Sequence, residues 1–147
     1  MTLNPLSEVR YRYRLALDHL RRARRMVNIE DWAGVVQSSQ LAVENFAKSI
    51  IAIFEVPTWS HDPSTQLHRL KERAPESVRS FLKRLAEVSS ELAPEHGRSS
   101  YGEPSRGLTP SDIYRRRHAM DSLRKAEETR KIVDKILKEL GVHLNST

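Results

Sequence analysis

A chain of 147 residues with 38% hydrophobic and 30% charged residues has the size and composition of one folded globular domain, and it is too apolar for a disordered protein. It contains no cysteine, which excludes disulfides, zinc–thiolate centres and thiol nucleophiles, and its formal net charge is +6. Because no apolar run approaches the roughly 20 residues of a membrane span, and the N-terminus lacks the apolar stretch of a secretory signal, we expect a cytoplasmic protein without membrane contact.

The first predicted helix begins at Pro5, with Asn4 as its N-cap, and continues to about Asn28. It is strongly basic, since residues 1–28 contribute +5 of the formal +6. A basic surface of this kind is suited to phosphate groups. The alternative is a solvated face whose arginines pair with acids on neighbouring helices, and both interpretations stay open. The arginines are Arg10, Arg12, Arg14, Arg21, Arg22, Arg24 and Arg25.

A second helix is predicted from the N-cap Asp31 to the residues before Pro57. Its second half, LAVENFAKSIIAIF, is apolar on nearly every side, which is typical of the most buried helix of a bundle. Glu44 and Lys48 are one turn apart, and a local ion pair is the simplest account of them. The alternatives for Lys48 are a surface ammonium group and a phosphate contact.

Two further helices and a long loop are predicted in the middle of the chain. Asp62 and Pro63 open a short helix, STQLHRLKER, and Pro75 begins a long helix whose apolar stripe extends to Leu92. Residues 94–110, PEHGRSSYGEPSRGLTP, hold three of the five glycines and three of the seven prolines. Structureless loops of this length in compact domains are usually functional or disordered, so we expect this loop to be more than a connector.

The last predicted helix has the clearest start. Thr109 caps it, Pro110 occupies the first position, and Asp112 completes an acidic variant of the capping box. Apolar positions follow helical spacing as far as Gly141, a natural C-terminal stop. No segment has the alternation of a strand. The sequence therefore predicts an all-α fold, an antiparallel up-and-down four-helix bundle with an extra short helix, formed by residues 1–147 as a single domain.

The chain contains, in this order, DWAGVVQSSQLAVENFAKSIIAIFEVP, STQLHRL, RSSYGE and IYRRRHAMDSLRKAEETRKIVDKIL. Together these segments resemble the HEPN domain (higher eukaryotes and prokaryotes nucleotide-binding domain). STQLHRL resembles the family's histidine-containing short helix, RSSYGE lies where the family often has an arginine–tyrosine–proline loop, and IYRRRHAMDSLRKAEETRKIVDKIL resembles its final helix. The order and lengths of the elements support the resemblance, which covers roughly residues 8–140. DWAGVVQSSQLAVENFAKSIIAIFEVP is similar to the family's second helix, with matching positions at Trp32, Gln37, Gln40, Ala42, Glu44 and Lys48.

The resemblance implies a helical bundle of HEPN type that commonly forms dimers. Many HEPN proteins are encoded beside a minimal nucleotidyltransferase as a toxin–antitoxin pair. Some are metal-independent RNases that use an arginine and a histidine separated by four to six residues, whereas others lack this pair and bind nucleotides or act as interaction modules. The expected partners are therefore a second copy of the chain, a nucleotidyltransferase, and a nucleotide or RNA ligand.

The arginine–histidine spacing of those RNases is found at Arg14 and His19. This pair is in the first helix, whereas the family's pair lies in the later part of the domain. His96 and Arg98 are too close together and in reverse order, and the side chains of residues 115–118 are contiguous, so they point in different directions on a helix. The catalytic residues therefore stay unassigned. A metal-independent RNase toxin, with a site formed across a dimer, is kept as an alternative.

Five residues are predicted to contact a nucleotide or phosphate. Arginine forks bind phosphate oxygens, a tyrosine ring stacks on bases, and the N-terminus of a helix favours anions. The candidates are Arg98, Tyr101, Arg106, Arg116 and Lys48. The alternative for Tyr101 is a plug at the end of the bundle, and that for the arginines is a solvated cluster. His61, Asp62 and His68 do not define a metal site, and we expect neither a metal nor a cofactor.

The sequence thus predicts a nucleotide- or RNA-binding module more than an enzyme. Its phosphate-facing surface is expected to combine the loop 94–110, the start of the last helix and the arginines of the first helix. A non-catalytic dimer whose basic surface binds an acidic protein is the second alternative, after the RNase toxin.

Overall fold

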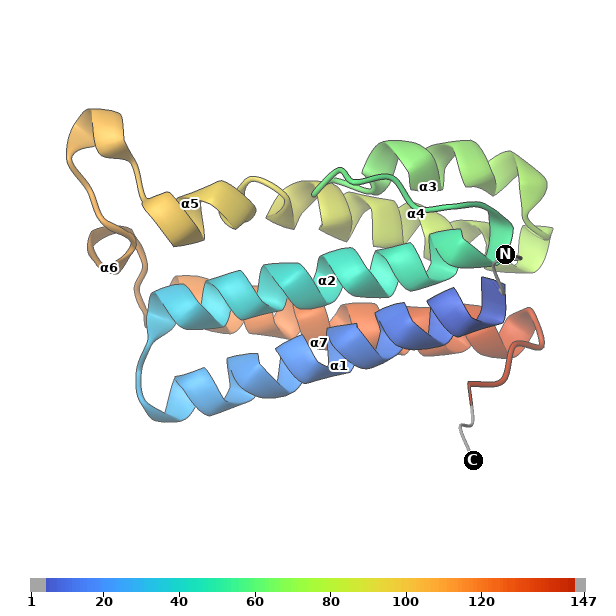
Figure 1. Ribbon diagram of the computed structural model, residues 1–147, viewed down its shortest axis with the longest axis horizontal. Helices are drawn as coiled ribbons and strands as arrows, with labels where there is room; N and C mark the ends of the chain where they lie inside the picture. Colours follow the sequence, from blue (N-terminus) through green and yellow to red (C-terminus); the bar gives the residue numbers. More distant parts are fainter. Residues whose placement is uncertain (1–4, 145–147) are drawn as a thin grey trace.

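The computed structural model describes residues 5–144, and each of its four long helices runs antiparallel to the next long helix along the chain in a bundle (Figure 1). They are α1 (Pro5–Asn28), α2 (Trp32–Phe54), α4 (Glu76–Leu92) and α7 (Arg116–Glu139). No strand forms between residues 5 and 144, so the predicted all-α bundle is confirmed. The proposed N-cap of α1, Asn4, lies outside the described residues.

The central helix of the bundle is α2, which packs against α1, α4 and α7 and against a short helix, α5 (Glu95–Tyr101). Nearly every residue between positions 35 and 52 is buried, because the sequence of α2 is apolar on almost all sides. Phe46, Ile50 and Ile51 are among the largest side chains that are fully buried. Within the described residues, none of the helices has both the length and the apolar character needed to cross a membrane.

A side-chain cap confirms the predicted start of α2, whereas α3 has Pro63, and not the predicted Asp62, as its N-cap. An Asp31 carboxylate oxygen accepts the backbone N–H of Gly34 at 2.9 Å at the start of α2. Asp62 accepts the N–H of Ser64 at 3.0 Å, where α3 (Ser64–Leu70) begins. The helix α3 continues into a 3₁₀ turn, η1 (Lys71–Arg73), so the predicted short helix STQLHRLKER is present over its whole length.

Residues 94–110 are more ordered than the predicted loop. Most of them belong to α5 and to a 3₁₀ turn, η2 (Pro104–Arg106). Gly102 ends α5 with a φ of 69°, a conformation that favours glycine, and the chain then turns back on itself. Glu103 and Leu108 exchange two backbone hydrogen bonds, of 2.8 and 3.1 Å, across this turn. The glycines and prolines therefore form tight turns between short helices, where the sequence had predicted a single long loop.

The last predicted helix is interrupted near its start. Residues Pro110–Ile113 form a separate turn, α6, and the chain is extended at Tyr114 before α7 begins. As predicted, the Asp112 carboxylate accepts the N–H of Thr109 at 2.9 Å. The interruption allows the ring of Tyr114 to be buried and its hydroxyl to donate to Glu95 of α5. Tertiary burial of one aromatic ring thus outweighs the local preference for a continuous helix.

Candidate functional site

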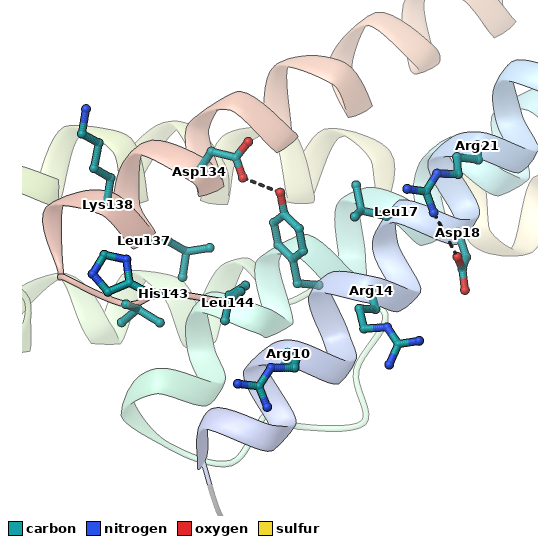
Figure 2. A pocket seen from close by; sticks show the side chains of 12 residues that line it. Arg10, Arg14, Leu17, Asp18, Arg21, Asp134, Leu137, Lys138, His143 and Leu144 are labelled. Carbon is teal, nitrogen blue, oxygen red and sulfur yellow. Dashed lines mark hydrogen bonds and ion pairs between the residues drawn. The ribbon is translucent and has the colours of Figure 1, made fainter. Parts of the chain in front are cut away.

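A groove lies between α1 and the C-terminal end of α7 (Figure 2), and we call it the α1–α7 groove. Its volume is about 570 Å³. The segment that follows α7 supplies part of its lining, because the chain turns back at Gly141, where φ is 68°. The lining residues are Arg10, Tyr13, Arg14, Leu17, Asp18, Arg21, Asp134, Leu137, Lys138, Val142, His143 and Leu144.

The α1–α7 groove has an excess of positive charge. Four permanently cationic side chains line it, together with two carboxylates and His143. Arg21 Nη1 lies 3.6 Å from Asp18 Oδ1. Within residues 5–144, the side chains of Arg10, Arg14 and Lys138 form no ion pair, and the buried Nε of Arg10 has no hydrogen-bond partner. Three cations of this groove are therefore available to an anionic ligand.

The second carboxylate of the groove, Asp134, is held by Tyr13. The Tyr13 hydroxyl donates to Asp134 Oδ1 at 2.5 Å (Figure 2). Burial, and then the hydrogen bond to Asp134, raise the pKa of Tyr13, so its phenol stays protonated near neutral pH. Leu17 and Leu137 add apolar surface beside the ring. The groove thus combines a partly apolar lining with cations, which suits a ligand that has both a flat ring and an anionic group.

A second polar cluster lies on α2, where Gln40, Glu44 and Lys48 follow one another at helical spacing. Glu44 and Lys48 are only 6% and 4% exposed. Lys48 Nζ donates to Glu44 Oε2 at 3.1 Å, and Gln40 Nε2 donates to Glu44 Oε1 at 3.1 Å. Burial pushes the pKa of Glu44 upward, but Lys48, Gln40 and His61 more than offset it, so the pKa lies below its ordinary value. Glu44 is therefore a buried carboxylate that stays ionised.

Two histidines from different segments stack beside this carboxylate, and we call them the histidine pair. His61 lies in the loop between α2 and α3, and His96 lies on α5; their ring centroids are 3.5 Å apart and their planes meet at 16°. His61 Nδ1 is 3.0 Å from Glu44 Oε1, and His96 Nδ1 is 3.0 Å from Gln40 Oε1. Burial and then the neighbouring His61 lower the pKa of His96, against an opposing effect of Glu44. His96 is therefore favoured as a neutral imidazole.

The predicted phosphate ligands Arg98 and Arg106 both bind acids of their own segment. Arg98 Nε donates to Glu103 Oε1 at 2.9 Å, and its Nη1 donates to Glu95 Oε1 at 3.2 Å. Arg106 Nη1 donates to Glu103 Oε2 at 2.7 Å. These hydrogen bonds lower the pKa of Glu103, which keeps it ionised. One carboxylate thus holds two of the predicted ligands, and their contact with phosphate stays a prediction.

Two other predicted ligands lie near the same end of the bundle. Tyr101 is 77% exposed, so its alternative role as a plug is wrong, and base stacking stays a prediction. The Arg116 guanidinium lies over the ring of Trp32, 5.7 Å from its centroid. Figure 1 places α5 and the start of α7 at one end of the bundle, whereas the groove adjoins the end of α7. The expected phosphate surface is therefore divided between two regions.

The structure also decides the surroundings of Lys48 and of the Arg14–His19 pair. Lys48 is buried beside Glu44, so the predicted local ion pair is confirmed and the surface alternative is wrong. Arg14 lines the α1–α7 groove, but His19 is not among the lining residues, and its Nδ1 lies 3.1 Å from Arg22 Nη1. Arg14 and His19 thus have separate surroundings in the described part of the chain.

The histidine pair was missed by the sequence analysis. His61 was considered there with Asp62 and His68, which are its neighbours in the sequence, and His96 only with Arg98. The one available signal was the row of polar residues on an otherwise apolar α2, since buried polar side chains require partners. In the groove, the arginines of α1 were recognised as a basic stripe, but the contribution of Lys138 was not.

These features define a class of protein, an up-and-down α-helical bundle with a basic groove beside its first and last helices. A family model described as the HEPN domain matches residues 9–140. The chain therefore belongs to the HEPN family, as its sequence resemblance indicated, and this membership supports a nucleotide- or RNA-related module. No curated protein and no solved structure was found to match the chain.

Proposed function

We propose that the chain is a nucleotide- or RNA-binding module whose α1–α7 groove receives the ligand. The observation that supports this most directly is the set of unpaired cations, Arg10, Arg14 and Lys138, which line one groove within the described part of the chain. The buried, unbonded Nε of Arg10 adds a hydrogen-bond donor that lacks an acceptor. A phosphate group would supply both the negative charge and the acceptor oxygens.

The chemistry of the groove suits such a ligand. Guanidinium groups bind phosphate oxygens through two parallel hydrogen bonds, and Lys138 acts as a point charge. The ring of Tyr13 and the side chains of Leu17 and Leu137 offer apolar contact to a base or a ribose. Because Asp18 and Asp134 already have partners, they add less repulsion toward an anion than free carboxylates would.

Fluorescence anisotropy with labelled single-stranded RNA, and competition by ATP, tests this proposal. We expect the Arg10→Ala/Arg14→Ala variant to bind RNA at least tenfold more weakly than the unmodified chain. Arg25→Ala is the matched control, because Arg25 is an exposed arginine on the same helix that does not line the groove. RNA binding that is unchanged in the double variant but weakened by Arg98→Ala/Tyr101→Ala would contradict the groove and favour the α5 end of the bundle.

The same samples decide between binding and cleavage. Incubating the chain with end-labelled RNA in EDTA should leave the RNA intact if the module only binds. Cleavage that follows the protein through purification would identify a metal-independent RNase, the alternative function. If neither RNA nor nucleotide binds, a protein partner for the basic groove becomes the better account.

We further propose that the chain acts as a homodimer and pairs with a minimal nucleotidyltransferase in a toxin–antitoxin-like system. The support is membership of the HEPN family, together with the resemblance described from the sequence. Light scattering of the purified chain measures the oligomeric state, and co-purification with a nucleotidyltransferase encoded beside it tests the partnership. A strictly monomeric chain that retains no such enzyme would contradict this part of the proposal.

A further inference from the structure

Hydrogen bonding places a hydrogen on the Nδ1 atom of both rings of the histidine pair. Gln40 donates its Nε2 to Glu44, so its Oε1 is left to accept, and the nearby His96 Nδ1 must carry the hydrogen. The oxygen 3.0 Å from His61 Nδ1 belongs to a carboxylate, so this nitrogen also carries a hydrogen. Each neutral imidazole therefore has its lone pair on Nε2.

Neither Nε2 has a hydrogen-bond partner within residues 5–144. The two rings are nevertheless stacked at 3.5 Å, and the His61 side chain is 55% exposed, so solvent and small ions reach the pair. Glu44 adds a negative charge, and ligand atoms of Glu44, His61 and His96 all lie within 4.8 Å of one another.

We infer that His61 and His96 bind a divalent transition-metal ion such as Zn²⁺, with Glu44 as the carboxylate that orients and charges the site. Metal-binding histidines almost always donate their other ring N–H to a carboxylate, a carbonyl or water, which is the arrangement of both rings here. Imidazole nitrogen favours Zn²⁺, Cu²⁺ and Ni²⁺ over Mg²⁺ and Ca²⁺. The near-parallel rings have to tilt to converge on one ion, and the exposed loop position of His61 permits that movement.

The composition of this site differs from the one considered in the sequence. Asp62 is not needed, because its carboxylate accepts the backbone N–H of Ser64. Lys48 occupies Oε2 of Glu44, and so Oε1 alone bonds to His61 and Gln40. The site lies apart from the α1–α7 groove and shares no lining residue with it. Metal binding at this site therefore does not depend on the proposed binding of a nucleotide in the groove.

Titration of the full, tag-free chain with Zn²⁺ in a calorimeter, and with Co²⁺ followed by visible absorption, tests the inference. We expect saturable binding of one ion per chain, a higher Tm with Zn²⁺, and a weaker response to Mg²⁺. Lowering the pH to 5 should weaken binding, because protons compete for the imidazoles. Glu44→Gln should reduce the affinity by about 10- to 100-fold, as loss of an outer-sphere partner does elsewhere.

Matched histidine variants keep the test specific. His61→Gln and His96→Gln should each weaken Zn²⁺ binding at least tenfold, whereas His68→Gln, on α3 and outside the pair, should leave it unchanged. Circular dichroism of each variant checks that the bundle is folded, and the exposed His61 is the variant least expected to disturb it. Absence of saturable binding, or binding that persists in the His61→Gln/His96→Gln variant, overturns the inference.

Discussion

Lys48 Nζ lies 3.1 Å from Glu44 Oε2, and both side chains are almost completely buried on the central helix α2. The two charges are one helical turn apart, so they hold each other without distortion of the backbone. Glu44 also accepts a hydrogen bond from Gln40 and bonds to His61. The ion pair therefore anchors the polar cluster that α5 and the loop before α3 cover.

Removing one partner of this ion pair should destabilise the fold. Lys48→Ala leaves the buried Glu44 carboxylate without its cation, and loss of one partner of a buried pair typically costs about 3–5 kcal/mol. We expect a loss near the lower end, about 3 kcal/mol, because Gln40 and His61 still bind the carboxylate. Urea unfolding measures the change in free energy.

The exposed pair Arg21–Asp18 is the control for this prediction. Both of its side chains are more than half exposed, so Arg21→Ala should cost only about 0–1 kcal/mol. The double variant Glu44→Gln/Lys48→Met should be more stable than Lys48→Ala, since it buries no lone charge. Equal and small losses for Lys48→Ala and Arg21→Ala would show that the buried pair does not anchor the cluster.

His96 should make stability depend on pH. The folded-state pKa of His96 lies below its ordinary 6.5, through burial and the neighbouring His61 and Lys48, against Glu44. Below pH 6.5 the unfolded chain therefore binds more protons at His96 than the folded chain does. The contribution of His96 to the free energy of unfolding is complete above pH 6.5 and is lost as the pH falls through the folded-state pKa. We expect the free energy of unfolding in metal-free buffer to decrease from pH 7 to pH 5.

His96→Gln should make this decrease smaller without removing it, because burial and Arg22 also lower the pKa of His19. His143→Gln serves as the comparison, since His143 lies in the groove and not in the cluster on α2. Urea unfolding at several pH values gives the slopes. A slope in His96→Gln as steep as in the unmodified chain would contradict the prediction.

Gly102 should be much less tolerant of substitution than Gly107. Both have a positive φ, of 69° and 67°, but a Cβ at Gly102 would lie 2.1 Å from the backbone oxygen of Leu108, whereas a Cβ at Gly107 meets no atom within 4 Å. We expect Gly102→Ala to cost about 3 kcal/mol from strain and collision together. Gly107→Ala should cost about 1 kcal/mol, from its left-handed conformation alone.

Thermal unfolding compares the two glycine variants directly. Because Gly102 ends α5, its substitution should also loosen the packing of α5 against α2, and with it the position of His96. Hydrogen exchange of the α5 amides reports that local loosening. Similar Tm values for the two variants would contradict the prediction. They would show that the turn can move the Leu108 backbone away from a Cβ at position 102 at little cost.

RNA binding should depend on salt through the groove cations. Each phosphate contact that is lost reduces the slope of log affinity against log salt by about 0.7 for a single strand. Arg14→Ala and Lys138→Ala should each lower the slope by about that amount, and Arg25→Ala should not. Anisotropy titrations at several salt concentrations measure the slopes. An unchanged slope in both groove variants would exclude phosphate contacts by these residues.

The helices were predictable because the signals that start and end them are local. Asp31 caps α2, Asp112 bonds to Thr109, and α7 ends just before Gly141. Each of these signals lies within one helical turn of the helix end that it marks. The break at Tyr114 was not predictable in this way. It depends on burial of the Tyr114 ring and on a bond to Glu95, which belongs to another helix.

The candidate sites show the same division. Arg10, Arg14, Arg21 and Arg25 of α1 share one face, so a basic stripe was visible in the sequence. The Glu44–Lys48 pair follows from the spacing of its two residues. Arg98 and Arg106 were expected to face a phosphate, but their acids, Glu95 and Glu103, are brought to them by the turns of the short helices. Which acids neutralise which arginines depends on the positions of the side chains, and a count of charges along the sequence does not give these positions.

The sequence by itself determined the helical class, the bundle and the family, because periodicity, caps and composition act over a few residues. Only the tertiary structure decided which charges are free and which polar groups meet. His61 and His96 are far apart in the chain, and they stack only because α5 and the loop before α3 both cover the same buried stripe of α2. Long-range contacts of this kind depend on how the helices pack together, which no local pattern specifies.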